Sequence, residues 1–346
     1  MLRNGISRFG RSRSAAAFVS LLERLPTAGD RLSVLTYHRI GDASLDGHLS
    51  PALISTSAAA FGDQMAHIAR RHHPVTANEL LAARDGQSLP SRSVLITFDD
   101  AYRDFAELAW PILERHGVPA VLFVPTAYPD ASAREFWWDR LFATLRALRP
   151  PTRLATPAGD VPYRSARDLM PTYRRLVAIA KSLSHADAMT WLDEMTAASD
   201  LRTGSLHQIL GWQELRQLAS AGATLAAHSR NHPRLDRLSD AELADEVAGS
   251  RRELDTNLGM PSPPIFAYPD GAHDERVLQA VAAAGYRVAF TTRRGSNSLG
   301  DVDWLRMRRI NIGQRSTLPL IRAQLLAPTM RTSAARRNGL EPRQTA

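Results

Sequence analysis

The 346-residue sequence contains no cysteine, almost no lysine and no long apolar run. Without cysteine the chain can form no disulfide and carry no thiol nucleophile, so any metal must be held by histidine and carboxylate. Only one of the 43 basic residues is a lysine, Lys181. No stretch approaches the roughly 20 apolar residues that a membrane-spanning helix needs.

The net charge of +8 does not by itself indicate a nucleic-acid partner. The arginines are scattered, and no stripe of interleaved aromatic and basic residues accompanies them. Abundant arginine and alanine with so little lysine are typical of the codon usage of a GC-rich genome. We therefore predict a globular protein with no nucleic-acid partner, long enough for one large α/β domain.

Residues 1–30 begin with four arginines and continue with a short apolar stretch from Ala15 to Leu22. This stretch is short for the apolar region of a signal peptide, and no small-residue cleavage site follows it. We expect instead an amphipathic N-terminal helix suited to rest on a membrane surface, and a cytoplasmic, membrane-peripheral location. The segment 329–346 is non-periodic, and we predict a disordered tail.

Between these ends, short apolar segments alternate with amphipathic helical patterns. Residues 94–98 read as a buried strand, residues 102–116 as a helix that stops at Gly117, and residues 120–124 as a second buried strand. This spacing indicates a βαβ unit and therefore a parallel sheet or barrel. Residues 131–210 interrupt the alternation. We predict that they form a helical insertion covering one face of the site, within a barrel domain at residues 31–328.

Two adjacent carboxylates, Asp99 and Asp100, directly follow the strand at residues 94–98. In α/β folds the C-terminal ends of the strands are where ligands bind. Neighbouring carboxylates repel each other, and a site keeps them together when a cation or a shared proton relieves the repulsion. The pair alone leaves open a simple turn or helix cap after the strand.

A second polar cluster, at residues 228–233, follows a predicted strand at residues 223–227 and contains His228 and His232. Two imidazoles four residues apart on one helical turn would face the same way and could bind one metal. This spacing alone is a weak signal. It gains weight here because the cluster stands at the C-terminal end of a strand, as the aspartate pair does.

The chain resembles the polysaccharide deacetylases of carbohydrate esterase family 4, the NodB-homology group. Segments 97–100 and 228–233 look like the first and second motifs of that family, in the right order. Segments 35–40 and 266–271 are similar to patterns of its bacterial exopolysaccharide branch. The resemblance covers residues 32–312 and implies a distorted (β/α) barrel, usually with seven strands. It also implies a divalent metal, most often zinc, with cobalt, nickel and manganese as alternatives.

The resemblance implies a role for each acidic and imidazole side chain. The second aspartate and the two histidines bind the metal in the family, which here means Asp100, His228 and His232. The first aspartate is the general base, here Asp99, and a backbone N–H near Asp270 would stabilise the oxyanion. The implied reaction is metal-dependent removal of N-acetyl groups from N-acetylhexosamine residues of a polysaccharide or glycolipid precursor.

The sequence departs from the family pattern in two places. Ala267 stands where many members carry an arginine that orients the base, and Arg309 could pair with Asp99 in its stead or anchor the substrate. The late histidine that serves as general acid is absent from residues 307–312. His38 is the best replacement because imidazole suits proton transfer near neutral pH, although it could simply support a loop. His273 is a weaker candidate.

Two aromatic residues complete the candidate site. Tyr268, beside the expected oxyanion donor, is a further candidate for contact with substrate. Trp138, next to Trp137 in the insertion, could stack on a sugar or pack the insertion against the barrel. The expected partner is an N-acetylated glycan, and nothing in the sequence indicates an oligomeric state. Two other functions stay open: a carbohydrate-binding barrel without chemistry, and a deacylase of an O-acetyl ester or a formamide sugar.

Overall fold

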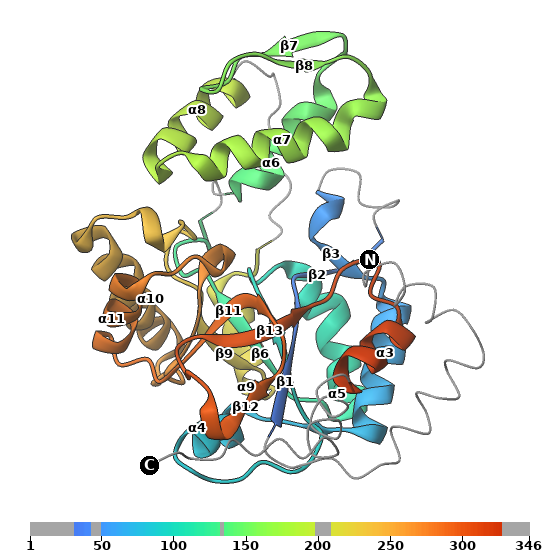
Figure 1. Cartoon of the computed structure of the whole chain (residues 1–346), viewed down its shortest axis with the longest axis vertical. Helices are drawn as coiled ribbons and strands as arrows, with labels where there is room; N and C mark the ends of the chain where they lie inside the picture. Colours follow the sequence, from blue (N-terminus) through green and yellow to red (C-terminus); the bar gives the residue numbers. More distant parts are fainter. Residues whose placement is uncertain (1–30, 43–49, 132–134, 198–208, 327–346) are drawn as a thin grey trace, which may run out of the picture.

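The structure, a computed structural model, describes residues 31–42, 50–131, 135–197 and 209–326, so the predicted N-terminal helix and the predicted tail lie outside the described residues. Seven parallel strands form a barrel, which closes because its first strand pairs with both the last and the second (Figure 1). The barrel strands are β1 (Arg31–Tyr37), β5 (Ser93–Phe98), β6 (Ala120–Val124), β9 (Thr224–Ala227), β10 (Ile265–Ala267), β11 (Val288–Arg294) and β13 (Met307–Asn311). The predicted seven-stranded (β/α) barrel is confirmed.

Helices surround the barrel, and their ends follow local sequence signals. They are α3 (Ala58–Arg71), α4 (Ala77–Arg84), α5 (Trp110–His116), α9 (Trp212–Ser220), α10 (Asp240–Leu258) and α11 (Glu275–Ala283). Ser57 and Ser239 cap α3 and α10, and Gly117 ends α5 in the left-handed conformation that glycine adopts most readily. Within the described residues, no helix combines the length and apolar character needed to cross a membrane.

Shorter elements complete the barrel domain. A π-helical segment, η2 (Phe105–Ala109), precedes α5, so the predicted helix from residue 102 begins with a wider turn. Strands β4 (His73–Pro74) and β12 (Asn297–Ser298) extend the sheet, and β2 (Arg39–Ile40) pairs with β3 (Ile54–Thr56). The remaining short helices are η1 (Pro51–Leu53), η3 (Ala166–Asp168), η4 (Leu235–Arg237), η5 (Pro269–Gly271) and η6 (Leu299–Asp301).

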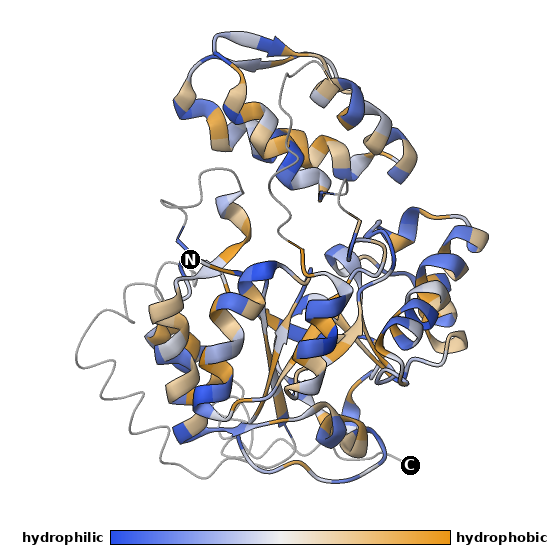
Figure 2. Ribbon diagram, turned by 180° about the vertical axis from the view of Figure 1, so that it is seen from behind, coloured by the Kyte–Doolittle hydropathy of each residue, from blue (hydrophilic) through white to orange (hydrophobic). Residues whose placement is uncertain are grey.

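Alternate residues of the barrel strands belong to two hydrophobic clusters. Leu95 and Met307 are members of a cluster that fills the barrel, whereas Ile96 belongs to the larger cluster between the strands and the helices. Figure 2 shows the strands largely in the hydrophobic colour and the outer faces of many helices in the hydrophilic colour. The same alternation directs Asp99 and Arg309, which follow Leu95 and Met307 at even spacing, toward the inside of the barrel.

The described part of the insertion, residues 135–197, forms a small unit at one end of the barrel (Figure 1). It contains α6 (Trp137–Ala147), α7 (Leu169–Ser182), α8 (His185–Ala197) and a hairpin of β7 (Thr152–Leu154) and β8 (Val161–Tyr163). The helices were expected, but the hairpin was not, because strands of three residues leave almost no periodicity to detect. The unit has its own hydrophobic cluster, which includes Leu176 and Trp191.

Candidate active site

The C-terminal ends of the barrel strands surround one cavity of about 340 Å³. His38 follows β1, Asp99 and Asp100 follow β5, and His228 follows β9. Helix α7 of the insertion adds a wall to the same cavity with Lys181 and neighbouring residues. The barrel therefore brings together polar groups that lie far apart in the sequence.

Asp100, His228 and His232 each offer a ligand atom, and these atoms lie within 4.8 Å of one another. Asp100 Oδ1 is 3.6 Å from His228 Nε2 and 3.4 Å from His232 Nε2. This oxygen is buried and has no hydrogen-bond partner in the described structure. Because an unsatisfied buried carboxylate oxygen is energetically costly, the arrangement fits a cation bound between the three side chains.

The backbone of β10 sets the tautomer of His228. His228 Nδ1 lies 2.8 Å from the carbonyl oxygen of Ala267. Because a carbonyl only accepts hydrogen bonds, Nδ1 carries the proton and Nε2 presents its lone pair toward Asp100. Burial lowers the pKa of His228 and of His232, which favours the neutral imidazole that binds metals.

The segment that carries the two histidines is a loop, so the prediction of a helical turn is wrong. Ser229 and His232 adopt the left-handed backbone conformation, with φ of 61° and 56°. Ser229 Oγ accepts a hydrogen bond of 3.1 Å from the N–H of His232. Glu246 of α10 accepts hydrogen bonds from the N–H groups of Arg230 and Asn231. These contacts bring both imidazoles to one point by fixing the loop rather than by helical spacing.

Asp99 forms a buried, two-pronged ion pair with Arg309. The two terminal nitrogens of Arg309 lie 2.8 Å from the two oxygens of Asp99, and Arg309 Nε donates to the Thr291 carbonyl at 3.0 Å. Burial opposes the charge on Asp99, but the positive charge of Arg309 outweighs it, so the pKa of Asp99 lies well below its usual range. The pairing that the sequence offered as one option for Arg309 is present in the structure.

Asp100 has the opposite electrostatic environment. Burial, together with the negative charge of Asp99, raises the pKa of Asp100 well above its usual range. Arg309 is fully used by Asp99, and Asp100 is left beside two neutral imidazoles. A cation held by Asp100 would relieve both burial and repulsion, which indicates that the two adjacent carboxylates have different tasks.

His38 lies at the cavity wall beside the paired aspartate. His38 Nε2 is 4.0 Å from Asp99 Oδ2, and the His38 side chain is 25% exposed. Its backbone N–H donates to Ser55 Oγ at 2.9 Å, and burial lowers the pKa of the imidazole. His273 is directed instead at the Gly271 carbonyl, with Nδ1 2.7 Å from that oxygen, and does not line the cavity.

The turn after β10 places Asp270 at the cavity in a left-handed conformation, with φ of 54°. The hydrogen bonds of this turn use the N–H groups of Gly271 and Ala272, which leaves the N–H of Asp270 outside them. A Cβ on Gly271 would lie 2.6 Å from the backbone nitrogen of Thr292, so only glycine fits there. The turn is therefore tightly packed beneath the predicted oxyanion donor.

The predicted aromatic residues line the cavity but are held by other contacts. The Tyr268 hydroxyl donates to the Leu305 carbonyl at 2.9 Å. Trp138 stacks on Phe136 with centroids 4.4 Å apart and meets the His232 ring edge-on at 4.9 Å. Trp138 is 8% exposed, so its contacts are those expected if it packs the insertion against the barrel rather than stacks on a sugar. Its ring packs against His232, a candidate metal ligand.

One buried acid at the site has no motif in the sequence. Asp139 Oδ2 accepts a hydrogen bond of 2.6 Å from the Tyr102 hydroxyl, which in turn accepts one from Trp138 Nε1 at 2.8 Å. Burial raises the pKa of Asp139 to about 6. Sequence reasoning missed it because an aspartate in the first turn of an amphipathic helix is an ordinary helix signal.

The site is thus an aspartate and two histidines, able to hold a cation, at the strand ends of a closed parallel barrel. Comparison with known proteins shows the family to which this barrel belongs. The family model for polysaccharide deacetylase matches residues 86–289. This is more than half of the chain, and the chain therefore belongs to the polysaccharide deacetylase family, as its motifs indicated.

Individual relatives are distant. The poly-beta-1,6-N-acetyl-D-glucosamine N-deacetylase of Escherichia coli K12 is 23% identical over 287 residues, which are 82% of this chain and 37% of the relative. The chain spans less than half the length of the curated relatives it matches. The Streptococcus pyogenes deacetylase PplD, solved in complex with acetate, has a TM-score of 0.58 at 18% identity, covering 87% of this chain and 99% of that one. IcaB from Ammonifex degensii has a TM-score of 0.57 at 18% identity, covering 86% and 98%. Both structures share the fold.

Proposed function

We propose that the protein is a metal-dependent hydrolase that removes N-acetyl groups from N-acetylhexosamine residues of a polysaccharide or glycolipid precursor. Family membership supports this proposal, as does the E. coli relative named as an N-deacetylase. The observation that carries it is the division of the aspartate pair: Arg309 pairs with Asp99 and keeps it ionised, and Asp100 Oδ1 is left without a partner beside two imidazoles.

Asp100, His228 and His232 would hold the cation. One carboxylate oxygen and two imidazole nitrogens suit zinc, and cobalt, nickel or manganese could use the same donors. When bound, such a cation lowers the pKa of water and polarises an amide carbonyl. Three protein ligands would leave coordination positions for both the water and the carbonyl oxygen.

Asp99 would act as the general base. It is kept ionised by Arg309 and stays outside the metal ligand set, so it can accept a proton from the water that attacks the amide carbon. The oxyanion that forms on the former carbonyl oxygen would accept a hydrogen bond from the N–H of Asp270. The rigid turn beneath Asp270 keeps this donor in place before the reaction begins.

His38 would act as the general acid that protonates the departing amine, so that acetate and a free amino sugar are released. Its Nε2, 4.0 Å from Asp99 Oδ2, places acid and base on the same side of the cavity. The imidazole is accessible to substrate because it is partly exposed. A deacylase of O-acetyl esters or formamides would use the same residues with a differently shaped acyl pocket.

The proposal is tested by acetate release from N-acetylglucosamine oligomers by two variants. Asp99→Asn should lower turnover by about 10² to 10⁴-fold with the metal content unchanged, since it removes only the base. His232→Ala should lose the metal itself, measured by elemental analysis. Parental activity of Asp99→Asn would refute the assignment of the base. Glycan binding without any acetate would favour the carbohydrate-binding barrel, and a panel of O-acetyl and N-formyl sugars identifies the acyl group.

A further inference from the structure

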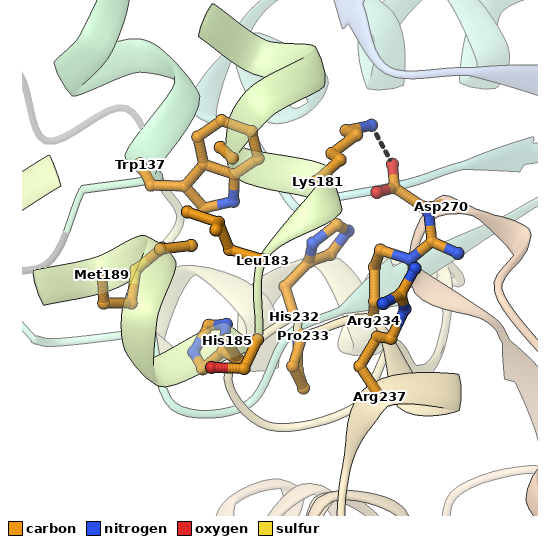
Figure 3. A pocket seen from close by; sticks show the side chains of 13 residues that line it. Trp137, Lys181, Leu183, His185, Met189, His232, Pro233, Arg234, Arg237 and Asp270 are labelled. Carbon is orange, nitrogen blue, oxygen red and sulfur yellow. Dashed lines mark hydrogen bonds and ion pairs between the residues drawn. The ribbon is translucent and has the colours of Figure 1, made fainter. Parts of the chain in front are cut away.

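A second, smaller pocket lies beside the catalytic cavity, between the insertion and the loop that follows His232 (Figure 3). The two share Trp137, Lys181, His232 and Asp270 as lining residues, so they are continuous. The free volume of this side pocket is about 30 Å³, against about 340 Å³ for the catalytic cavity. The side pocket has room for a small substituent and not for a second sugar ring.

The two walls of the side pocket differ in chemistry. Figure 3 shows Trp137, Leu183 and Met189 of the insertion together on one side. Arg234 and Arg237 lie on the other side, near Asp270. An apolar and aromatic wall suits the face of a sugar ring, whereas two guanidinium groups suit an anion.

The charged side chains at the side pocket leave one cation in excess of the acids. Lys181 Nζ pairs with Asp270 Oδ1 at 2.5 Å, and Arg234 pairs with Asp236 through two hydrogen bonds of 3.2 and 2.8 Å. Arg237 is exposed and forms no ion pair within 4.0 Å in the part of the chain that the structure describes. It helps to lower the pKa of Asp236, but that carboxylate is already paired with Arg234. The pocket therefore has a net positive charge at the end where Arg237 lies.

Two acids lie behind the pocket but do not line it. His185 also lines the pocket. The carboxylates of Glu246 and Glu242 lie close enough to act electrostatically on the His185 imidazole. The Glu246 carboxylate, however, already accepts hydrogen bonds from Arg230 and Asn231, and Glu242 caps α10. Both carboxylates keep their negative charge and act on His185, but they are directed at backbone N–H groups, away from the side of the pocket where Arg237 lies.

We propose that the side pocket binds an anionic substituent, a carboxylate or a phosphate, attached next to the N-acetylated sugar, and that Arg237 is the residue that selects it. The proposal rests on the proposed function and specifies its substrate class as an acidic glycan. Either anion presents oxygens that the planar fork of a guanidinium can bind in pairs. Trp137, which also lines the catalytic cavity, would meanwhile contact the ring that carries the anion.

Acetate release from matched acidic and neutral probes tests the proposal. One pair consists of oligosaccharides that alternate glucuronate and N-acetylglucosamine, with and without reduction of the carboxylates to alcohols. The other pair consists of N-acetylglucosamine 1-phosphate and methyl N-acetylglucosaminide. For at least one pair, we expect kcat/KM to be about threefold to fivefold higher for the acidic member than for the neutral member. The difference should come from a lower KM, and it should decrease as salt is added. The pair with the larger preference identifies the anion.

Arg237→Gln should remove this preference by raising KM for the acidic probe, with the neutral probe and kcat unchanged. Arg237→Lys should retain part of it, because it keeps the charge without the fork. Arg252→Gln is the matched control, since Arg252 is an exposed arginine of α10 that does not line either pocket. Equal kcat/KM for acidic and neutral probes in the parent, or equal losses on both in Arg237→Gln, would overturn the proposal.

Calorimetric titration separates this proposal from the proposed function. If no probe releases acetate, the deacetylase assignment fails, and the same probe pairs are then titrated against the parent and Arg237→Gln. Tighter binding of an acidic probe that is lost in Arg237→Gln would still support the anion pocket. Indistinguishable binding of acidic and neutral probes would overturn it.

Discussion

At the scale of single residues, the site depends on two neighbouring carboxylates with opposite surroundings. Arg309 binds both oxygens of Asp99, whereas Asp100 Oδ1 is buried without a partner between two imidazoles. Asp99 is thereby kept ionised, as a general base must be, and Asp100 is available to a cation. Different partners, rather than different residue types, give the two aspartates different chemistry.

Arg309→Lys tests how Asp99 is kept ionised. Lysine keeps the charge but cannot bind both oxygens in one plane, so we expect kcat to fall roughly tenfold to a hundredfold through misplacement of the base. Because Arg309 lowers the pKa of Asp99, weakening the pair raises that pKa. A base must be ionised, so the loss of kcat/KM on acidification should begin at a higher pH.

The pH–rate profiles of parent and variant provide this measurement. Arg308→Lys is the control, because Arg308 is the exposed neighbour on β13. An unchanged acidic limb in Arg309→Lys would contradict the role of Arg309.

His38→Ala tests the general acid. Loss of the proton donor should lower kcat by about 10² to 10⁴-fold, with the metal content unchanged. His273→Ala, which removes an imidazole that is directed at the Gly271 carbonyl and lies outside the cavity, should retain activity. Loss of the metal from His38→Ala would instead make His38 a ligand.

The sequence predicted these residues unequally well. Asp99 and Asp100 follow a strand so clearly that their place was predictable, and alternation from Met307 directs Arg309 inward. Arg309 could have paired with Asp99 or bound the substrate. No local sequence pattern could decide between these roles, because Asp99 lies 210 residues away in the sequence. The spacing of the two histidines is compatible with a helix and with a loop, and contacts from α10 decide for the loop.

At the scale of elements, α6 attaches the insertion to the barrel through buried polar contacts. Asp139 accepts a hydrogen bond from Tyr102 and, at 3.4 Å, from the N–H of Ser50. Trp138 of the same helix packs against His232. The insertion is thus joined to the wall of the candidate metal site, so its stability and the order of the site are linked.

Asp139→Asn tests this contact through the pH dependence of stability. Because the pKa of Asp139 is raised to about 6, the folded state binds a proton more tightly than the unfolded state. The free energy of unfolding should therefore fall as pH rises from about 4 to 6, by about 2 to 3 kcal/mol from this group. Asparagine does not titrate, so the variant should gain stability relative to the parent by that amount between pH 4.5 and 7.5.

Thermal unfolding of both proteins across this pH range measures the difference. Asp63→Asn, the same substitution at an exposed position of α3, is the control. A difference between parent and Asp139→Asn that does not vary with pH would show that Asp139 titrates normally.

Prediction of the elements succeeded where capping residues and periodicity agree. Gly117 ends α5 as expected, and Ser57 and Ser239 cap the starts of α3 and α10. The β7–β8 hairpin and the π-helical segment η2 were not predictable, because each occupies only a few residues and is stabilised by packing rather than by local preference.

At the scale of the whole molecule, closure of the barrel brings the chemistry together. Because β1 pairs with both β5 and β13, the C-terminal ends of the first and last barrel strands meet beside Asp99. The insertion then adds Lys181 and Trp137 to the cavity, so that substrate would contact both the barrel and the insertion. The parallel order of the strands places every reactive group at the same end.

We propose that this chain releases acetate from an N-acetylated glycan with the help of a cation at Asp100, His228 and His232. The most direct measurement is the acetate released from N-acetylglucosamine oligomers by the metal-loaded protein, the chelated protein and the chelated protein resupplied with zinc. We predict many turnovers, then none, then recovery. Equal acetate release from the chelated and the loaded protein would contradict the account.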